Sequence, residues 1–109
     1  MRYYKLDENK KTIPCDLMEW LQMFEDQHGR RVEWTEIDRF DISTVFLGLD
    51  HNYFGGRPLL FETMIFDPKG NDLYMRRCST WEEAEEMHKE AIKWVEEAIK
   101  WVEKGCKDE

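Results

Sequence analysis

Polar and apolar residues follow two different rhythms along this chain, and the rhythms predict its elements. Residues that alternate, or that are β-branched and apolar without a break, are typical of strands, whereas apolar residues three and four positions apart indicate helices. Strands are predicted at 3–6, 12–15, 30–37, 42–49, 59–66 and 73–78. Residues 42–49 and 59–66 are apolar on both parities, so we expect these two strands to be covered on both faces.

Two helices are predicted between and after these strands, and each begins with a capping box. Asp16 and Glu19 open the first helix, which carries apolar residues at spacings of four and three and runs to about Gln27. Thr80 and Glu83 open the second helix, which covers about 81–104. The order of elements indicates an α+β domain: an antiparallel sheet of four to six strands with a short helix and a long C-terminal helix. The length of 109 residues fits a single domain, 1–109.

The long helix contains a seven-residue unit written twice, at 91–97 and 98–104. Its apolar residues span about 160° of the helix circumference, which is wider than the seam of a simple coiled coil. The helix should measure about 36 Å and an eight-residue strand about 26 Å, so the second unit should extend past the sheet. Unless the sheet and the first helix together cover both units, a partner must do so, and a twofold homodimer is the commonest solution. The predicted interface residues are Trp94, Val95, Ala98, Trp101 and Val102.

Composition narrows the classes of partner. The net charge of −8 disfavours binding to the phosphate backbone of nucleic acids, although an acidic surface could also imitate nucleic acid toward a basic partner. The three cysteines, Cys15, Cys78 and Cys106, form no CxxC pair, so we expect free thiols and no zinc site. There is no apolar segment of the kind that a signal peptide or a membrane span needs, which favours the cytoplasm. No motif implies a cofactor.

The segment STVFLGLDHNYFGGRPLLFETMIFD, residues 43–67, holds the candidate site. Its polar centre, Asp50-His51-Asn52, could supply a general base or a metal ligand, because imidazole titrates near neutrality. The same residues also suit a bend, since Asp and Asn bond to their own backbone and glycines allow positive φ. The bend is the stronger interpretation, with a contact surface as its possible use. The candidate binding residues are Asp50, His51, Asn52, Tyr53, Arg57, Glu62 and Arg76, where Glu62 needs a partner from among Arg57, Arg76 and His51.

Aromatic side chains could instead build a cage for a cationic or nucleotide-like ligand from Trp20, Trp34, Tyr53 and Phe54. Aromatic residues in a small domain more often form its core, and we favour that interpretation.

Three motifs in a fixed order, STVFLGLDHN, PLLFETM and STWEEAE, resemble a family of small proteins from phages and prophage-bearing bacteria. The resemblance covers roughly Val32 to His88 and transfers no catalytic residue. It implies a phage-type origin, and hence a role in assembly, host takeover or counter-defence. With the acidity and the wide apolar helix face, it favours a non-enzymatic protein that binds and blocks a host or phage macromolecule, with a protein as the partner. The alternative is a small-ligand or nucleotide binder or hydrolase that uses Asp50, His51 and Glu62.

Overall fold

The computed structural model describes residues 2–105, which form six strands and three helices. The helices are α1 (Leu17–Glu25), α2 (Gln27–Arg30) and α3 (Trp81–Gly105). The strands are β1 (Tyr3–Leu6), β2 (Thr12–Cys15), β3 (Arg31–Ile37), β4 (Phe40–Phe46), β5 (Phe61–Phe66) and β6 (Asp72–Cys78). This is the α+β class that the sequence predicts.

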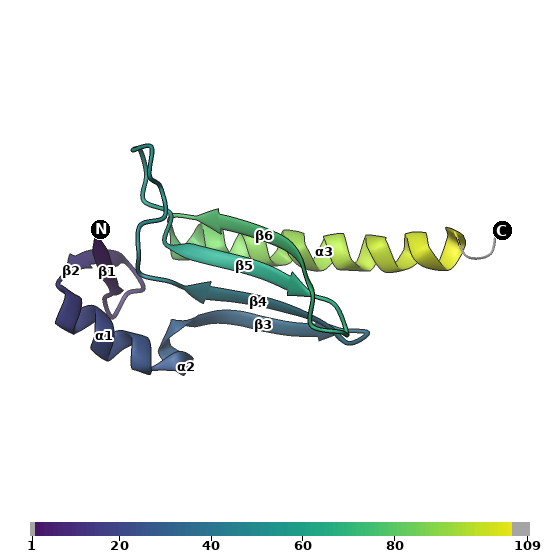
Figure 1. Ribbon diagram of the computed structural model, residues 1–109, viewed down its shortest axis with the longest axis horizontal. Coiled ribbons are helices and arrows are strands. Elements are labelled where there is room, and N and C mark those ends of the chain that lie inside the picture. The colour runs from purple at the N-terminus through teal and green to yellow at the C-terminus, as the bar shows by residue number, and fades with distance from the viewer. Residues whose placement is uncertain (1, 106–109) are drawn as a thin grey trace.

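The strands make two antiparallel sheets rather than one. β3, β4, β5 and β6 form a four-stranded sheet in chain order, and β1 and β2 form a separate hairpin. In Figure 1 the hairpin and α1 lie at one end of the large sheet, and α3 lies behind the sheet along its strands. The molecule is therefore elongated, with principal extents of 56 × 29 × 23 Å.

Both predicted capping boxes are present. The Asp16 carboxylate accepts from the Glu19 backbone N–H at 2.8 Å, and the Thr80 hydroxyl accepts from the Glu83 N–H at 3.1 Å. The first helix ends at Glu25, before the predicted Gln27, because Asp26 interrupts it and its carboxylate accepts from the N–H of Gly29 at 3.0 Å. Gly29 lies within the short α2.

The core lies between α3 and one face of the large sheet. Ala84, Ala91 and Val95 line the inner side of α3, and small residues at two of these positions let the helix approach the strands closely. From β4 and β5, the buried residues that face α3 are Ile42, Thr44, Phe46, Phe61, Thr63 and Ile65.

A buried histidine joins the helix to three strands at the centre of this core. His88 on α3 is fully buried, and its Nδ1 lies 2.7 Å from the Thr44 hydroxyl, which in turn lies 2.5 Å from the Thr63 hydroxyl. The other ring nitrogen, Nε2, lies 2.9 Å from the hydroxyl of Thr35 on β3. A neutral imidazole donates from one nitrogen and accepts at the other, so both nitrogens are satisfied.

The opposite face of the large sheet contradicts the expectation that β4 and β5 are covered on both sides. No described helix lies over it, as Figure 1 shows. Val45, Met64 and Phe66 alternate with the buried residues and point to this open side, where they are half-buried by their neighbours within the sheet. Apolar residues on both parities therefore do not indicate two covering layers here.

The long helix extends past the sheet, as the comparison of lengths predicts. Its 25 residues give a length of about 37 Å, whereas a seven-residue strand measures about 24 Å. Figure 1 shows the last turns of α3 running beyond the turns that join the strands.

Neither α3 nor any other described helix is long and apolar enough to cross a membrane. Cys15 and Cys78 are free thiols, and Cys106 lies outside the described residues.

The buried histidine predicts a pH-dependent stability. Burial lowers the pKa of His88, and Glu33, whose carboxylate lies 3.8 Å from Nε2, opposes this only in part. The unfolded chain takes up a proton at His88 near pH 6.5 while the folded chain stays neutral there, so stability should fall as pH drops below about 6.5.

Urea unfolding of the wild type and of His88→Gln at pH 5.5, 6.5 and 7.5 tests this. The variant should lose about 2 kcal/mol at pH 7.5, because one amide cannot satisfy both threonine contacts. That difference should shrink toward pH 5.5. His51→Ala, at a histidine outside the core, is the control. A difference between wild type and His88→Gln that does not change with pH would contradict the assignment.

Candidate functional site

The connection between β4 and β5 is anchored to the N-terminal hairpin at Gly48 and the residues beside it. Gly48 has a φ of 73°, and a Cβ at this position would lie 2.6 Å from the indole nitrogen of Trp20 and 2.8 Å from the carbonyl oxygen of Tyr4. The Tyr4 N–H donates to the Gly48 carbonyl at 2.8 Å, and the Trp20 indole N–H donates to the Leu47 carbonyl at 3.1 Å. The hairpin and α1 therefore dock where this loop leaves the sheet.

The polar residues of the loop bond chiefly to the loop itself. The Asp50 carboxylate accepts from the N–H groups of Asn52 and Leu59, at 2.9 and 3.2 Å, and so ties the two ends of the loop together. The Asn52 amide donates to the Arg57 carbonyl at 2.9 Å. These bonds are the ones that a bend requires, and within residues 2–105 no carboxylate is hydrogen-bonded to the ring of His51.

Glu62 and Arg76, which the sequence places with this loop, lie on opposite faces of the sheet. Glu62 points to the open face and pairs with Arg77 at 3.0 Å, so the prediction that its partner is Arg57, Arg76 or His51 is wrong. Arg76 points to the other face and pairs with Glu90 of α3 at 2.5 Å. The seven candidate residues therefore do not all converge on one site: Asn52, Arg57 and Arg76 line one hollow, whereas Glu62 lies on the other face of the sheet.

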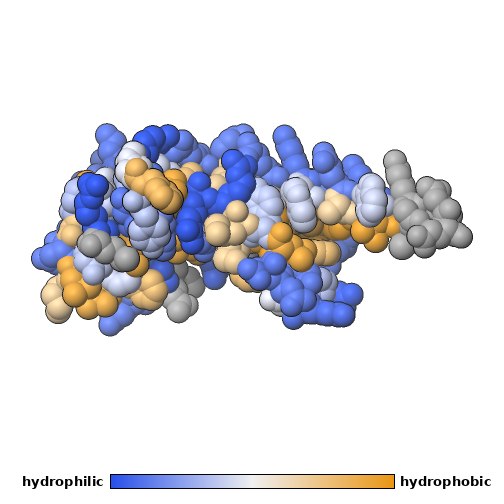
Figure 2. All heavy atoms as spheres, turned by 45° about the horizontal axis from the view of Figure 1, so that its top comes forward, coloured by the Kyte–Doolittle hydropathy of each residue, from blue (hydrophilic) through white to orange (hydrophobic). Residues whose placement is uncertain are grey.

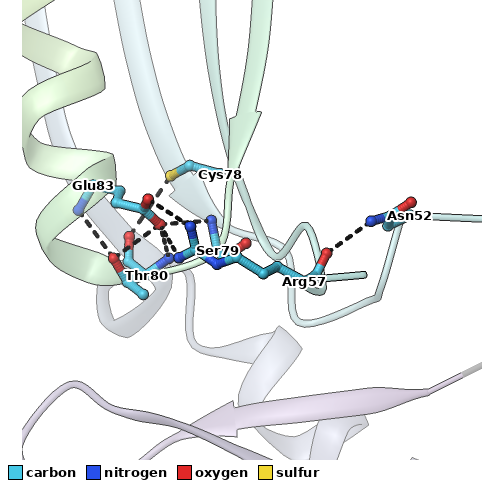
Figure 3. A network of polar contacts seen from close by, with 6 residues as sticks. All are labelled: Asn52, Arg57, Cys78, Ser79, Thr80 and Glu83. Atoms are coloured by element: carbon cyan, nitrogen blue, oxygen red, sulfur yellow. Dashed lines mark hydrogen bonds and ion pairs between the residues drawn. The ribbon is translucent and has the colours of Figure 1, made fainter. Parts of the chain in front are cut away.

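Arg57 closes the loop onto the start of α3, as Figure 3 shows. Its guanidinium binds both oxygens of Glu83, at 2.7 and 3.0 Å, while Glu83 also accepts from the backbone N–H and the hydroxyl of Thr80, both at 3.1 Å. The bond from Arg57 holds the pKa of Glu83 below its usual range. Both groups serve to fix the loop and the helix start.

A hollow of about 520 Å³ lies between this loop and the first turns of α3. Arg57, Arg76 and Arg77 reach its wall, and each of them already pairs with a glutamate. Cys78 is the thiol in this wall, and burial raises its pKa to about 11, so it is protonated at neutral pH and is a poor nucleophile. Among residues 2–105 no cluster of three His, Cys, Asp or Glu side chains could hold a metal ion.

The four aromatic residues considered for a cage also lie apart. Trp20 packs between Tyr3 and Phe24, with ring centroids 5.6 and 4.8 Å away. Trp34 lies on the open sheet face, and Tyr53 and Phe54 are 73% and 100% exposed at the loop tip. The structure therefore forms no cage from these side chains.

The end of α3 bears the exposed apolar surface that the repeated unit predicts. Trp101 is 75% exposed and Val102 53%, although Val102 lies on the same side of the helix as the buried Ala84, Ala91 and Val95. Trp94 is 41% exposed and packs on Tyr74, and Ala98 is half-buried, whereas Val95 is buried within its own chain and is not a free contact residue. The apolar stripe of α3 thus continues past the point where the sheet ends.

A small apolar hollow of about 240 Å³ lies under this end of the helix. Its walls come from Phe40 near the β3–β4 turn and from Ala98, Ile99 and Val102 of α3, with Asp38 and Glu103 at the rim. An apolar cavity of about 150 Å³ accepts a benzene molecule, so this hollow has room for an aromatic side chain. Figure 2 shows hydrophobic colour extending along this half of the molecule toward the end of α3. We call the exposed side chains Trp94, Trp101 and Val102, the half-buried Ala98 and this hollow the helix-end surface.

Comparison of the chain with models of known protein families, with curated proteins and with solved structures gives no significant match.

A pair of substitutions distinguishes a bend from a contact site in the loop. Asp50→Ala should lower stability by about 1–2 kcal/mol, because it removes the acceptor that ties residues 52 and 59 together. His51→Ala should leave the melting temperature and the binding of a partner nearly unchanged. Thermal unfolding and a binding assay on both variants check this. A loss of partner affinity in His51→Ala at an unchanged melting temperature would make the loop a contact site.

Proposed function

We propose that this protein is a small acidic interaction protein that binds and blocks another macromolecule, with a protein as its target, and that it acts as a homodimer. The resemblance of its motifs to phage proteins supports a role in the cytoplasm of a phage-bearing cell, such as inhibition of a host defence protein. The observation that carries the proposal is the helix-end surface, where Trp101 and Val102 remain exposed beyond the sheet.

Energetics favour a partner at the helix-end surface. Each of its large side chains would contribute roughly 1.5–3 kcal/mol on burial. A second copy is the occupant that we propose, because two helix ends in antiparallel contact would each place Trp101 near the hollow beside Phe40 of the other copy. Such an interface repeats the same contacts on both sides of the twofold axis.

The charged groups support binding rather than chemistry. A hydrolase that uses Asp50, His51 and Glu62 needs these groups around one substrate, yet Asp50 is bonded within the loop and Glu62 pairs with Arg77 on the open sheet face. The only thiol near the hollow beside α3, among the described residues, has a raised pKa. These observations favour the interaction protein over the ligand binder or hydrolase.

Light scattering tests the dimer. At tens of micromolar the wild type should show twice its chain mass of 13.3 kDa, and Trp101→Glu should show the single mass, because a charge at the centre of an apolar contact is costly. Phe54→Glu is the matched control, because it alters a fully exposed aromatic residue far from Trp101 in the sequence, and it should remain dimeric. A wild-type mass of one chain with an intact helix would refute the dimer.

A capture experiment tests the target-binding part of the proposal. Immobilised wild-type protein should retain a specific protein from a lysate of the host cell, and a purified preparation of that protein should lose its activity on binding. Retention of no specific protein, or retention without inhibition, would contradict a binding-and-blocking role.

A further inference from the structure

The open face of the large sheet is a second exposed surface, and its residues follow from strand alternation. Thr35, Ile42, Thr63 and Tyr74 point toward α3, so their neighbours along each strand point away from it. Figure 1 is a view of this side and shows no element in front of the four strands. The apolar residues on it are Trp34, Val45, Met64, Phe66, Leu73 and Met75.

Three of these residues form a row that crosses the whole sheet. The register pairs Trp34 with Ser43, Ser43 with Met64, and Met64 with Met75. Trp34 at one edge is 48% exposed and Met75 at the other is 51% exposed. Three strand spacings make the row about 14 Å long. Tryptophan and methionine are enriched at protein interfaces, and methionine adapts its shape to different partners.

A second row, about 7 Å further along the strands, is acidic. The register pairs Glu36 with Asp41, Asp41 with Phe66, and, across the irregularity that skips Leu73, Phe66 with Asp72. None of the three carboxylates makes an ion pair within the described part of the chain, whereas Glu62, on the other side of the apolar row, pairs with Arg77. The open face therefore presents an apolar row flanked on one side by unpaired negative charge.

We propose that the open sheet face binds a basic amphipathic helix of a protein partner. The apolar stripe of that helix would lie along Trp34, Met64 and Met75, and lysines or arginines on one flank would lie over Glu36, Asp41 and Asp72. About three helical turns match the 14 Å row at a pitch of 5.4 Å. This names the docking surface and the chemistry of the target, and it rests on the proposed interaction function.

Charge selects this occupant over a second copy of the chain. Each copy carries a net charge of −8 and brings its own unpaired carboxylates to the contact, so the face favours a basic partner. The same charge disfavours a nucleic acid or an anionic membrane at this surface.

The test uses a synthetic helical peptide as the probe. A fluorescent peptide of about 18 residues, with leucine at helical spacing and lysine elsewhere, is titrated with the full-length protein, and anisotropy gives the Kd. Met75→Glu should weaken binding at least about tenfold, because it removes an apolar contact and buries a charge. Glu36→Lys combined with Asp72→Lys should weaken binding and flatten its dependence on salt.

Matched controls separate this surface from charge in general. Glu82→Lys with Glu97→Lys makes the same change in net charge at two exposed positions of α3, and it should have a much smaller effect. A peptide with glutamate in place of lysine should bind weakly. Circular dichroism checks folding, and Met75→Ser is a milder variant that should also weaken binding.

The proposal would be overturned if the basic peptide did not bind, or if the two charge-reversal pairs weakened its binding equally. Loss of the dimer in Met75→Glu would also overturn it, because that result would assign the open sheet face to a second copy. Failure of the wider function would be distinct. Retention of a host protein by wild type and Met75→Glu alike would keep the interaction function and reject this surface. If neither the wild type nor Met75→Glu retained a host protein, while the wild type still bound the peptide, the proposed interaction function would be rejected and the peptide-binding surface would stand.

Discussion

The packing of one helical stripe against one face of a four-stranded sheet is the constraint on which the rest of this structure depends. Small residues at Ala84 and Ala91 set the closeness of that packing, and His88 fixes the helix through hydrogen bonds to threonines of β3 and β4. A polar group at the centre of an apolar interface tolerates few alternative positions, because a shift would leave it unsatisfied. The helix therefore has a defined register on the sheet.

This register determines which surfaces remain exposed. With its first turn held to the loop between β4 and β5 by Arg57 and Glu83, a helix of this length must extend past the far ends of the strands. One helix also covers only one side of a sheet, so the other side is left to solvent or to a partner. The two exposed apolar surfaces differ in chemistry: the hollow at the helix end is lined mainly by apolar side chains, and the open sheet face borders unpaired carboxylates. They suit different partners.

Sequence patterns predicted the elements well, because strand alternation and capping boxes are local features. The long helix, its overrun and the exposure of Trp101 also follow from local spacing and length. The sequence offered Arg57, Arg76 and His51 as partners of Glu62 and missed Arg77. Arg76 and Arg77 are adjacent, and a one-residue difference in register moves a side chain to the other face. The uncovered sheet face could not be read from apolar content alone. The sequence did indicate the burial of His88, since this residue lies four positions after Ala84 on the inner face of the helix. Its threonine partners could not be predicted, because they come from strands that are distant in the sequence.

The edges of the large sheet carry a further consequence, which concerns aggregation. β3 and β6 are the outer strands, and each contains an irregularity, between Arg31 and Glu33 in β3 and at Leu73 in the pairing of β6 with β5. Bulges and charged side chains at an edge interrupt the regular ladder that a strand from another molecule would need, and β6 also carries Arg76 and Arg77 there. These features oppose edge-to-edge pairing of strands from different molecules, which is the first step toward fibres. A chain that needs exposed apolar faces for its contacts can keep them because its edges resist that growth.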